Sequence, residues 1–191
     1  MSRQAVQKRT GSPRRTCGIS RAVAATALLL LSLAVYPGAG AAAQEMPEQK
    51  RGPVTNLPLP RFVSMKASEG NVRRGPSLTH RIDWVFKRRG MPLEITAEYG
   101  HWRRVRDRDG AGGWVHYALL SGIRTVLIEE DMLRVRSRPE ETAPVMAAFE
   151  LGVVAQLGAC EINWCEVTAG GHHGWAPKAK LWGVAPDELR E

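Results

Sequence analysis

The sequence repeats one short pattern about sixty residues apart, and this repetition constrains the fold more than any other feature. Within residues 101–116, an alternating run starts at Trp102, passes through Val105 and a turn rich in Asp and Gly, and ends in Gly-Trp-Val. Residues 163–176 have the same order: Trp-x-x-Val, a turn, and Gly-Trp followed by a small residue. Alternation around an Asp-Gly turn predicts a β-hairpin. Its recurrence predicts a duplicated structural unit.

Other positions match at nearly the same spacing. The matched pairs are Val72 and Val135, Pro76 and Pro139, Gly90 and Gly152, Trp102 and Trp164, Val105 and Val167, and Trp114 and Trp175. Short alternating segments between frequent turns predict an all-β fold, either a small barrel or a sandwich, in each unit. We place the two units at residues 61–122 and 123–183, with a 3₁₀ turn over residues 117–120 closing the first. Residues 184–191 form a polar tail that we expect to be frayed.

Residues 1–43 have the composition of an export signal. A basic segment precedes fifteen almost wholly apolar residues at 22–36, and small residues then lead up to a cleavage position between Ala43 and Gln44. This order is typical of a secretory signal peptide. A retained anchor is the alternative, but spanning a bilayer takes roughly 20 apolar residues. We therefore expect a periplasmic protein that contacts the membrane only transiently, through its signal peptide.

The next segment, residues 44–60, contains Pro47, Pro53, Pro58 and Pro60. Proline fixes one backbone dihedral and cannot donate a hydrogen bond to a sheet or helix. This density of proline predicts a flexible, extended linker between the signal peptide and the first unit.

The charge of the chain does not predict a nucleic-acid partner. The formal net charge is +8, but residues 1–43 hold six Lys or Arg and no Asp or Glu. The remainder carries 21 basic and 19 acidic side chains, a net charge of +2. A balance this close to neutral gives little attraction to polyanions.

The first unit also resembles a known family. The positions that carry the resemblance are Asn71-Val72-Arg73-x-Gly75-Pro76-Ser77, Gly90-x-Pro92, Trp102-Arg103-Arg104-Val105-Arg106 and Gly113-Trp114-Val115-His116. They resemble the bacterial SH3-like (SH3b) domains of exported proteins, and most of all an alphaproteobacterial type with a signal peptide and two such domains. The resemblance implies two tandem five-stranded, partly open barrels that bind peptides, cell-wall fragments or partner proteins without catalysis. The second unit departs from the pattern at Arg138 and Ala176.

Two cysteines remain after signal cleavage, Cys160 and Cys165, and they flank a tight reversal. In an oxidising compartment an even cysteine count at this spacing predicts a disulfide. Two alternatives use the same residues. Both cysteines with His172 and His173 would be a Cys₂His₂ metal set, and Cys165 with a His172 base would imitate a cell-wall cysteine hydrolase.

The better candidate for function is the hairpin strand of the first unit. On an extended strand Trp102, Arg104 and Arg106 share one face, and Val105 lies on the other. If Val105 faces the core, Trp102 is exposed beside two guanidinium groups, which can stack on a ligand and pair with its carboxylates. Trp84 is a further candidate groove residue. The alternative is that Trp102 covers a barrel rim and the arginines form a solvated face.

The sequence therefore predicts an exported, non-catalytic binding module without cofactor or metal. Its expected ligand is a peptide, a partner protein or peptidoglycan, approached through Trp102, Arg104, Arg106 and Trp84. A cysteine hydrolase and a purely structural module are the alternatives.

Overall fold

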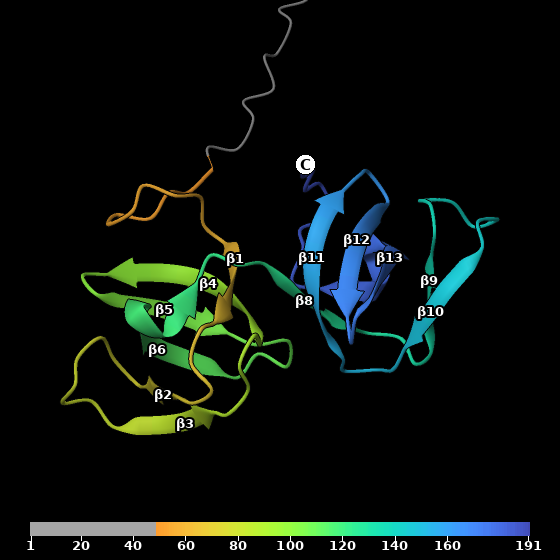
Figure 1. Ribbon diagram of the computed structural model, residues 1–191. Coiled ribbons are helices and arrows are strands. Elements are labelled where there is room, and N and C mark those ends of the chain that lie inside the picture. The colour runs from red at the N-terminus through yellow and green to blue at the C-terminus, as the bar shows by residue number, and fades with distance from the viewer. Residues whose placement is uncertain (1–48) are drawn as a thin grey trace, which may run out of the picture. The chain divides into compact units, whose positions relative to one another are not determined.

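The structure, a computed structural model, describes residues 49–191. Within this range the chain forms two sheets joined by a short connection, without an α-helix (Figure 1). None of the helical turns in the described range is long and apolar enough to span a bilayer. The predicted signal peptide and its cleavage position at Ala43 and Gln44 lie outside the described residues.

The first repeat is a seven-stranded antiparallel sheet. Its elements are β1 (Arg61–Met65), β2 (Gly70–Arg73), β3 (Ile82–Phe86), β4 (Pro92–Tyr99), β5 (Trp102–Arg106), β6 (Gly112–His116), the 3₁₀ turn η1 (Tyr117–Leu119) and β7 (Leu120–Ser121). The order of hydrogen-bonded neighbours is β3-β2-β6-β5-β4-β1-β7.

The second repeat has the same plan. Its elements are β8 (Thr125–Ile128), β9 (Leu133–Arg136), β10 (Val145–Phe149), β11 (Val154–Cys160), β12 (Trp164–Ala169), β13 (His172–Pro177), η2 (Lys178–Lys180) and β14 (Leu181–Trp182). The order β10-β9-β13-β12-β11-β8-β14 is the first order shifted by seven strands throughout. The predicted duplication is therefore confirmed at the level of topology.

The predicted five-stranded barrel is not confirmed. Each repeat has seven strands in a linear order that does not close. A two-residue strand such as β7 has no periodicity that a sequence can reveal, because alternation needs about four residues to register. The 3₁₀ turn η1, which the sequence did predict, leads directly into β7. This strand pairs with β1 through Met65 and Leu120.

Matched apolar residues form a separate core in each repeat. The buried pairs are Val72 and Val135, Phe86 and Phe149, Ile95 and Leu157, Val105 and Val167, and Val115 and Ala176. Burial alternates along strands such as β5 and β9, where every second residue is inside.

The Gly of each Gly-Trp pair is required by a close approach between strands. A Cβ atom on Gly113 would lie 2.6 Å from the carbonyl oxygen of Arg73, and one on Gly174 would lie 2.5 Å from that of Arg136. Only a residue without a side chain fits there, which explains why glycine recurs at this place in both hairpins.

We therefore expect Gly113→Ala to destabilise the first repeat by about 1–2 kcal/mol through overpacking, measured by urea unfolding. Gly122→Ala is the matched control, because no atom of the described part of the chain lies within 4 Å of its Cβ position. An equal effect of both substitutions would contradict the close-approach explanation.

The described part of the predicted flexible linker is folded. Residues 51–58 loop back on themselves through a bridge between Arg51 and Pro58 (Figure 1), and Leu59 is buried in the core of the first repeat. We call residues 51–60 the N-terminal arm. The expectation of mobility was wrong here because the prolines exclude a helix without excluding a loop fixed by side-chain contacts.

The predicted frayed tail is also held in place. The backbone of Arg190 makes two hydrogen bonds with that of Cys160, at 2.7 and 3.0 Å, and Glu188 pairs with Arg124 at 2.8 Å. This backbone pairing places the end of the chain beside Cys160, the last residue of β11, which the local polarity of the tail does not predict.

Candidate functional site

The outer face of β5 and β6 carries the candidate residues that the sequence places on one face. Along β5, Arg103 and Val105 are buried, and Trp102, Arg104 and Arg106 lie on the opposite face. The predicted alternation is therefore present, with Val105 only 2% exposed.

A hollow of about 650 Å³ lies on this face. We call it the arginine groove. Its lining residues include Arg74, Asp83, Arg104, Arg106 and Trp114. The indole of Trp114 comes from β6, where Trp114 pairs with Arg104 across the strands, so the groove combines an aromatic wall with three guanidinium groups.

Some charged side chains of the groove have an ion-pair partner and others do not. Arg106 is paired with Glu94, and the hydrogen bond with Glu94 raises the pKa of Arg106. Hydrogen bonds from Arg81 and then Arg74 lower the pKa of Asp83. Among the described residues Arg104 has no carboxylate within ion-pair distance, so its guanidinium is the cation most available to a ligand.

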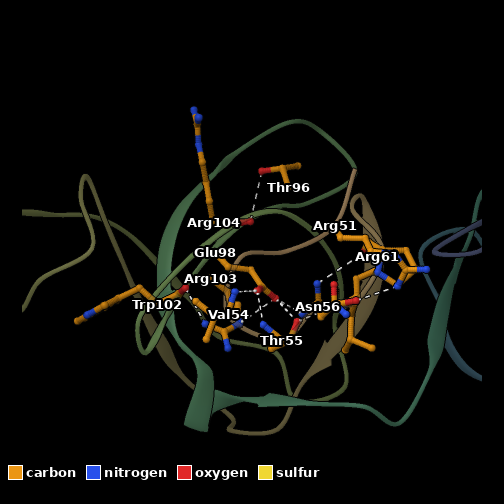
Figure 2. Close-up of polar contacts among 12 residues, drawn as sticks. Arg51, Val54, Thr55, Asn56, Arg61, Thr96, Glu98, Trp102, Arg103 and Arg104 are labelled. Carbon is orange, nitrogen blue, oxygen red and sulfur yellow. Dashed lines mark hydrogen bonds and ion pairs between the residues drawn. The ribbon is translucent and has the colours of Figure 1, made fainter. Parts of the chain in front are cut away.

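A buried carboxylate lies on the other side of these strands. Glu98 at the end of β4 has a fully buried side chain, and it accepts hydrogen bonds from Thr55, Val54 and Arg61 at 2.6–3.1 Å. Arg103 lies 3.5 Å from the same carboxylate. Figure 2 shows these groups converging on Glu98, while Arg104 points away from them.

The hydrogen bonds decide the protonation of Glu98. Burial alone raises the pKa of a carboxyl group because it disfavours the charged form. The donors of Thr55, Arg61 and Val54 outweigh burial and lower the pKa of Glu98 to about 2. Glu98 is thus ionised at neutral pH and fixes both the N-terminal arm and Arg103, which in turn donates to the carbonyls of Gly100 and Trp102.

Beyond the arginine groove the same face ends in aromatic side chains. The indole of Trp102 meets His116 edge to face at 5.6 Å. His116 lies 4.9 Å from Tyr117 and 5.9 Å from His101, measured between ring centroids. Tyr99 pairs with Trp102 across the β4–β5 turn. We call these five residues the ring cluster.

The structure separates the four predicted ligand residues. Arg104 and Arg106 line the groove, and Trp102 belongs to the ring cluster. Trp84 is part of neither the groove nor the cluster. Trp84 lies on the edge strand β3, is 54% exposed and pairs with Val72.

The sequence analysis did not single out Trp114, His101 or His116 as candidate site residues. The sequence does show aromatic residues at both ends of the hairpin, at 99–102 and 116–117, which could have indicated a cluster. Only the register, which sets Trp102 opposite His116, shows that they meet.

The second repeat has hollows of about 640 and 940 Å³ on either side of Trp164 and Ile162. The charged residues of the smaller one are already engaged. Lys178 donates to backbone carbonyl oxygens, and Glu141 pairs with Arg136 at 3.3 Å. The larger hollow is lined by one cation, Arg190, and by the carboxylates of Glu161 and Glu191, so its charge does not favour an anionic ligand. We therefore place the candidate site on the first repeat, where three arginines and one aspartate line the groove and Arg104 is available.

Cys160 and Cys165 form a disulfide, with an S–S distance of 2.08 Å. Neither sulfur is then a free metal ligand or nucleophile. His172 lies at the other end of the hairpin, four residues along the strand from the partner of Cys165, or about 13 Å at strand spacing. Residues 49–191 contain no group of three or more His, Cys, Asp or Glu side chains that could hold a metal ion.

Comparison with protein families decides the assignment of the two repeats. Residues 66–122 and residues 129–183 each match the family described as the bacterial SH3 domain. The chain belongs to the bacterial SH3 domain family. Each match covers six of the seven strands of one sheet and leaves out the first, β1 or β8.

Similar proteins include a Bacillus subtilis (strain 168) protein named as an N-acetylmuramoyl-L-alanine amidase, YrvJ. It is 27% identical over 141 residues, which cover 63% of this chain and 27% of that protein. The SH3 chain thus spans about a quarter of the length of this curated relative. The solved structures of NlpC2 and NlpC1 from Trichomonas vaginalis are 11% and 12% identical, with a TM-score of 0.31. Each match covers 64% of this chain and 47% or 45% of the other.

Proposed function

We propose that this protein is an exported, non-catalytic module that binds peptidoglycan in the cell envelope through the outer face of its first SH3 repeat. The observation that carries the proposal is the arginine groove, where Arg104, which has no ion-pair partner within residues 49–191, lies beside Trp114 on the neighbouring strand. A guanidinium binds a carboxylate through two parallel hydrogen bonds, and an adjacent indole adds apolar contact area.

Peptidoglycan fits this chemistry because its short peptides carry free carboxylates. The name of the Bacillus subtilis relative refers to N-acetylmuramoyl-L-alanine, which is the sugar–peptide link of that polymer. The match covers only 27% of the relative, so we propose a shared target and not a shared reaction.

The absence of catalysis is part of the proposal. The cysteine hydrolase that the sequence left open needs a free thiol, whereas Cys165 is buried and bonded to Cys160. Thiol titration of the native protein tests this directly. We expect no reactive thiol from these two residues, and a free thiol of low pKa would restore the enzyme hypothesis.

We expect Arg104→Ala to weaken binding to purified peptidoglycan sacculi about tenfold, because one charge-assisted contact contributes about 1.5 kcal/mol or more. Co-sedimentation with sacculi measures the affinity. Arg134→Ala is the matched control, since Arg134 is an exposed arginine on β9 of the second repeat.

Equal binding by both variants would remove the arginine groove from the site. Retention of the wild-type protein by envelope proteins or peptides, and not by sacculi, would favour the peptide or partner-protein alternatives.

A further inference from the structure

The ring cluster is a second feature of the same face, and the arginine groove does not account for it. Its members come from the end of β4, the β4–β5 turn, the start of β5, the end of β6 and η1. They lie outside the hydrophobic core of the first repeat. Tyr99 is 64% exposed and Tyr117 is 50% exposed. Exposed aromatic rings gathered in one place mark binding surfaces more often than structural ones.

The second repeat shows that the fold does not need these rings. At the positions of Tyr99, His101, His116 and Tyr117 it has Glu161, Asn163, Pro177 and Lys178, and only the Trp is kept. The same seven-stranded order forms with one ring of the five. Four rings of the first repeat therefore require an explanation other than folding.

Two hydrogen bonds hold the backbone of the cluster and one of its rings. The backbone N–H of Tyr117 donates to the carbonyl of His101 at 2.9 Å. The Nδ1 atom of His116 accepts from the N–H of Ala118 at 3.3 Å. The first bond joins the β4–β5 turn to the start of η1, and the second fixes the ring of His116, so part of the surface is arranged before a ligand binds.

The ring types indicate the chemistry of the ligand. All five side chains are Tyr, His or Trp, which have an apolar ring face and a polar edge atom, and none is Phe. A surface of Tyr, Trp and His rings offers aromatic faces for stacking and edge atoms for hydrogen bonds. A sugar ring has the complementary arrangement, with C–H groups on one face and hydroxyl or amide groups around its edge.

We propose that the ring cluster is a saccharide-binding subsite for the N-acetylated sugar rings of a glycan. The inference rests on the proposed binding of peptidoglycan and adds which part of the polymer is recognised and where. Trp102 and Arg104 are two residues apart on one strand face, or about 7 Å. A sugar stacked on the rings therefore places an attached carboxylate at the mouth of the arginine groove.

The test uses the trisaccharide of N-acetylglucosamine, which has sugar rings and no peptide. Isothermal titration calorimetry with the whole protein should show saturable binding, and NMR should show a shift of the Trp102 indole N–H signal. Tyr117→Ala should weaken this binding about tenfold or more. Tyr117→Phe, which keeps the ring, should weaken it about threefold, so an effect of misfolding can be recognised.

Two controls separate this subsite from the rest of the molecule. Arg104→Ala should leave the affinity for the uncharged trisaccharide within about twofold of wild type, although it weakens sacculus binding. Ile162→Ala, at the matching turn of the second repeat, should also have no effect, since this exposed side chain lies outside the ring cluster.

Binding to sacculi without binding to the trisaccharide would overturn the saccharide subsite and leave the proposed function in place. Failure to bind either would overturn both. Trisaccharide binding that is unchanged by Tyr117→Ala would move the subsite elsewhere and overturn the present assignment.

Discussion

Glu98→Gln is expected to lower the free energy of unfolding of the first repeat by about 3–5 kcal/mol. The substitution keeps the shape of the side chain but removes the charge that Arg61 and Arg103 face in a buried setting. Removing one member of a buried ion pair leaves the other charge uncompensated, which costs about this much. Urea unfolding measures the loss. Amide hydrogen exchange at Val54 and Thr55, which donate to Glu98, should show release of the N-terminal arm.

The same carboxylate predicts an acid limit to stability. The pKa of Glu98 is lowered from 4.5 to about 2 in the folded chain, so folding favours its ionised form. This contribution is fully present above pH 4.5, and it is lost as the pH falls towards 2. The shift corresponds to about 3 kcal/mol. We expect the stability difference between wild type and Glu98→Gln to shrink over this interval.

Glu141→Gln is the control, because Glu141 also pairs with an arginine but is 75% exposed. Exposed ion pairs contribute at most about 1 kcal/mol. A similar small loss for Glu98→Gln would contradict the central role of this carboxylate. Combining it with Arg103→Met should recover part of the stability, since the unpaired buried charge is then absent.

The two repeats fill one structural position with different chemistry. Glu98 and Arg103 are cross-strand partners at the end of the β4–β5 hairpin, and Cys160 and Cys165 are partners at the same place in β11–β12. In each repeat this position also anchors an outer segment. Glu98 holds the N-terminal arm, and the backbone of Cys160 holds the C-terminal segment through Arg190. The ion pair of the first repeat and the disulfide of the second therefore occupy the same structural position.

The sequence predicted the duplication well because its markers are fixed by backbone geometry. Gly113 and Gly174 permit close strand contact, and Gly90 and Gly152 both have positive φ, at 75° and 79°. Such positions tolerate few other residues, so they stay recognisable in both copies. Strand number and closure were not predictable, since a two-residue strand leaves no pattern.

The arm and the ring cluster depend on contacts between distant parts of the chain. The carboxylate of Glu98 meets Thr55, 43 residues away, and no local composition encodes that pairing. The alternation of β5 correctly placed Arg104 outward. The partner across the strands, Trp114, depended on the register, which local sequence does not specify on a strongly polar face.

Replacing both cysteines by alanine is expected to destabilise the second repeat by about 2 kcal/mol. The bridge joins residues only five apart, so it closes a small loop and restricts the unfolded chain less than a long-range bridge would. For a repeat of about 60 residues this loss lowers the Tm by roughly 8–16 °C. Differential scanning calorimetry measures it, and a reducing agent should reproduce the effect in the wild-type protein.

Because the first repeat has the ion pair of Glu98 and the second has the disulfide, each repeat is a control for the other. Among the described residues both cysteines belong to the second repeat, so reduction should leave the amide exchange of Val54 and Thr55 in the first repeat unchanged. Acid between pH 4.5 and 2 should release these two amides and leave the bridge intact, because a disulfide does not titrate. Loss of amide-exchange protection in the N-terminal arm on reduction would show that the two repeats are not stabilised independently. If each treatment affects only one repeat, the ion pair and the disulfide each stabilise the repeat that contains them and not the other.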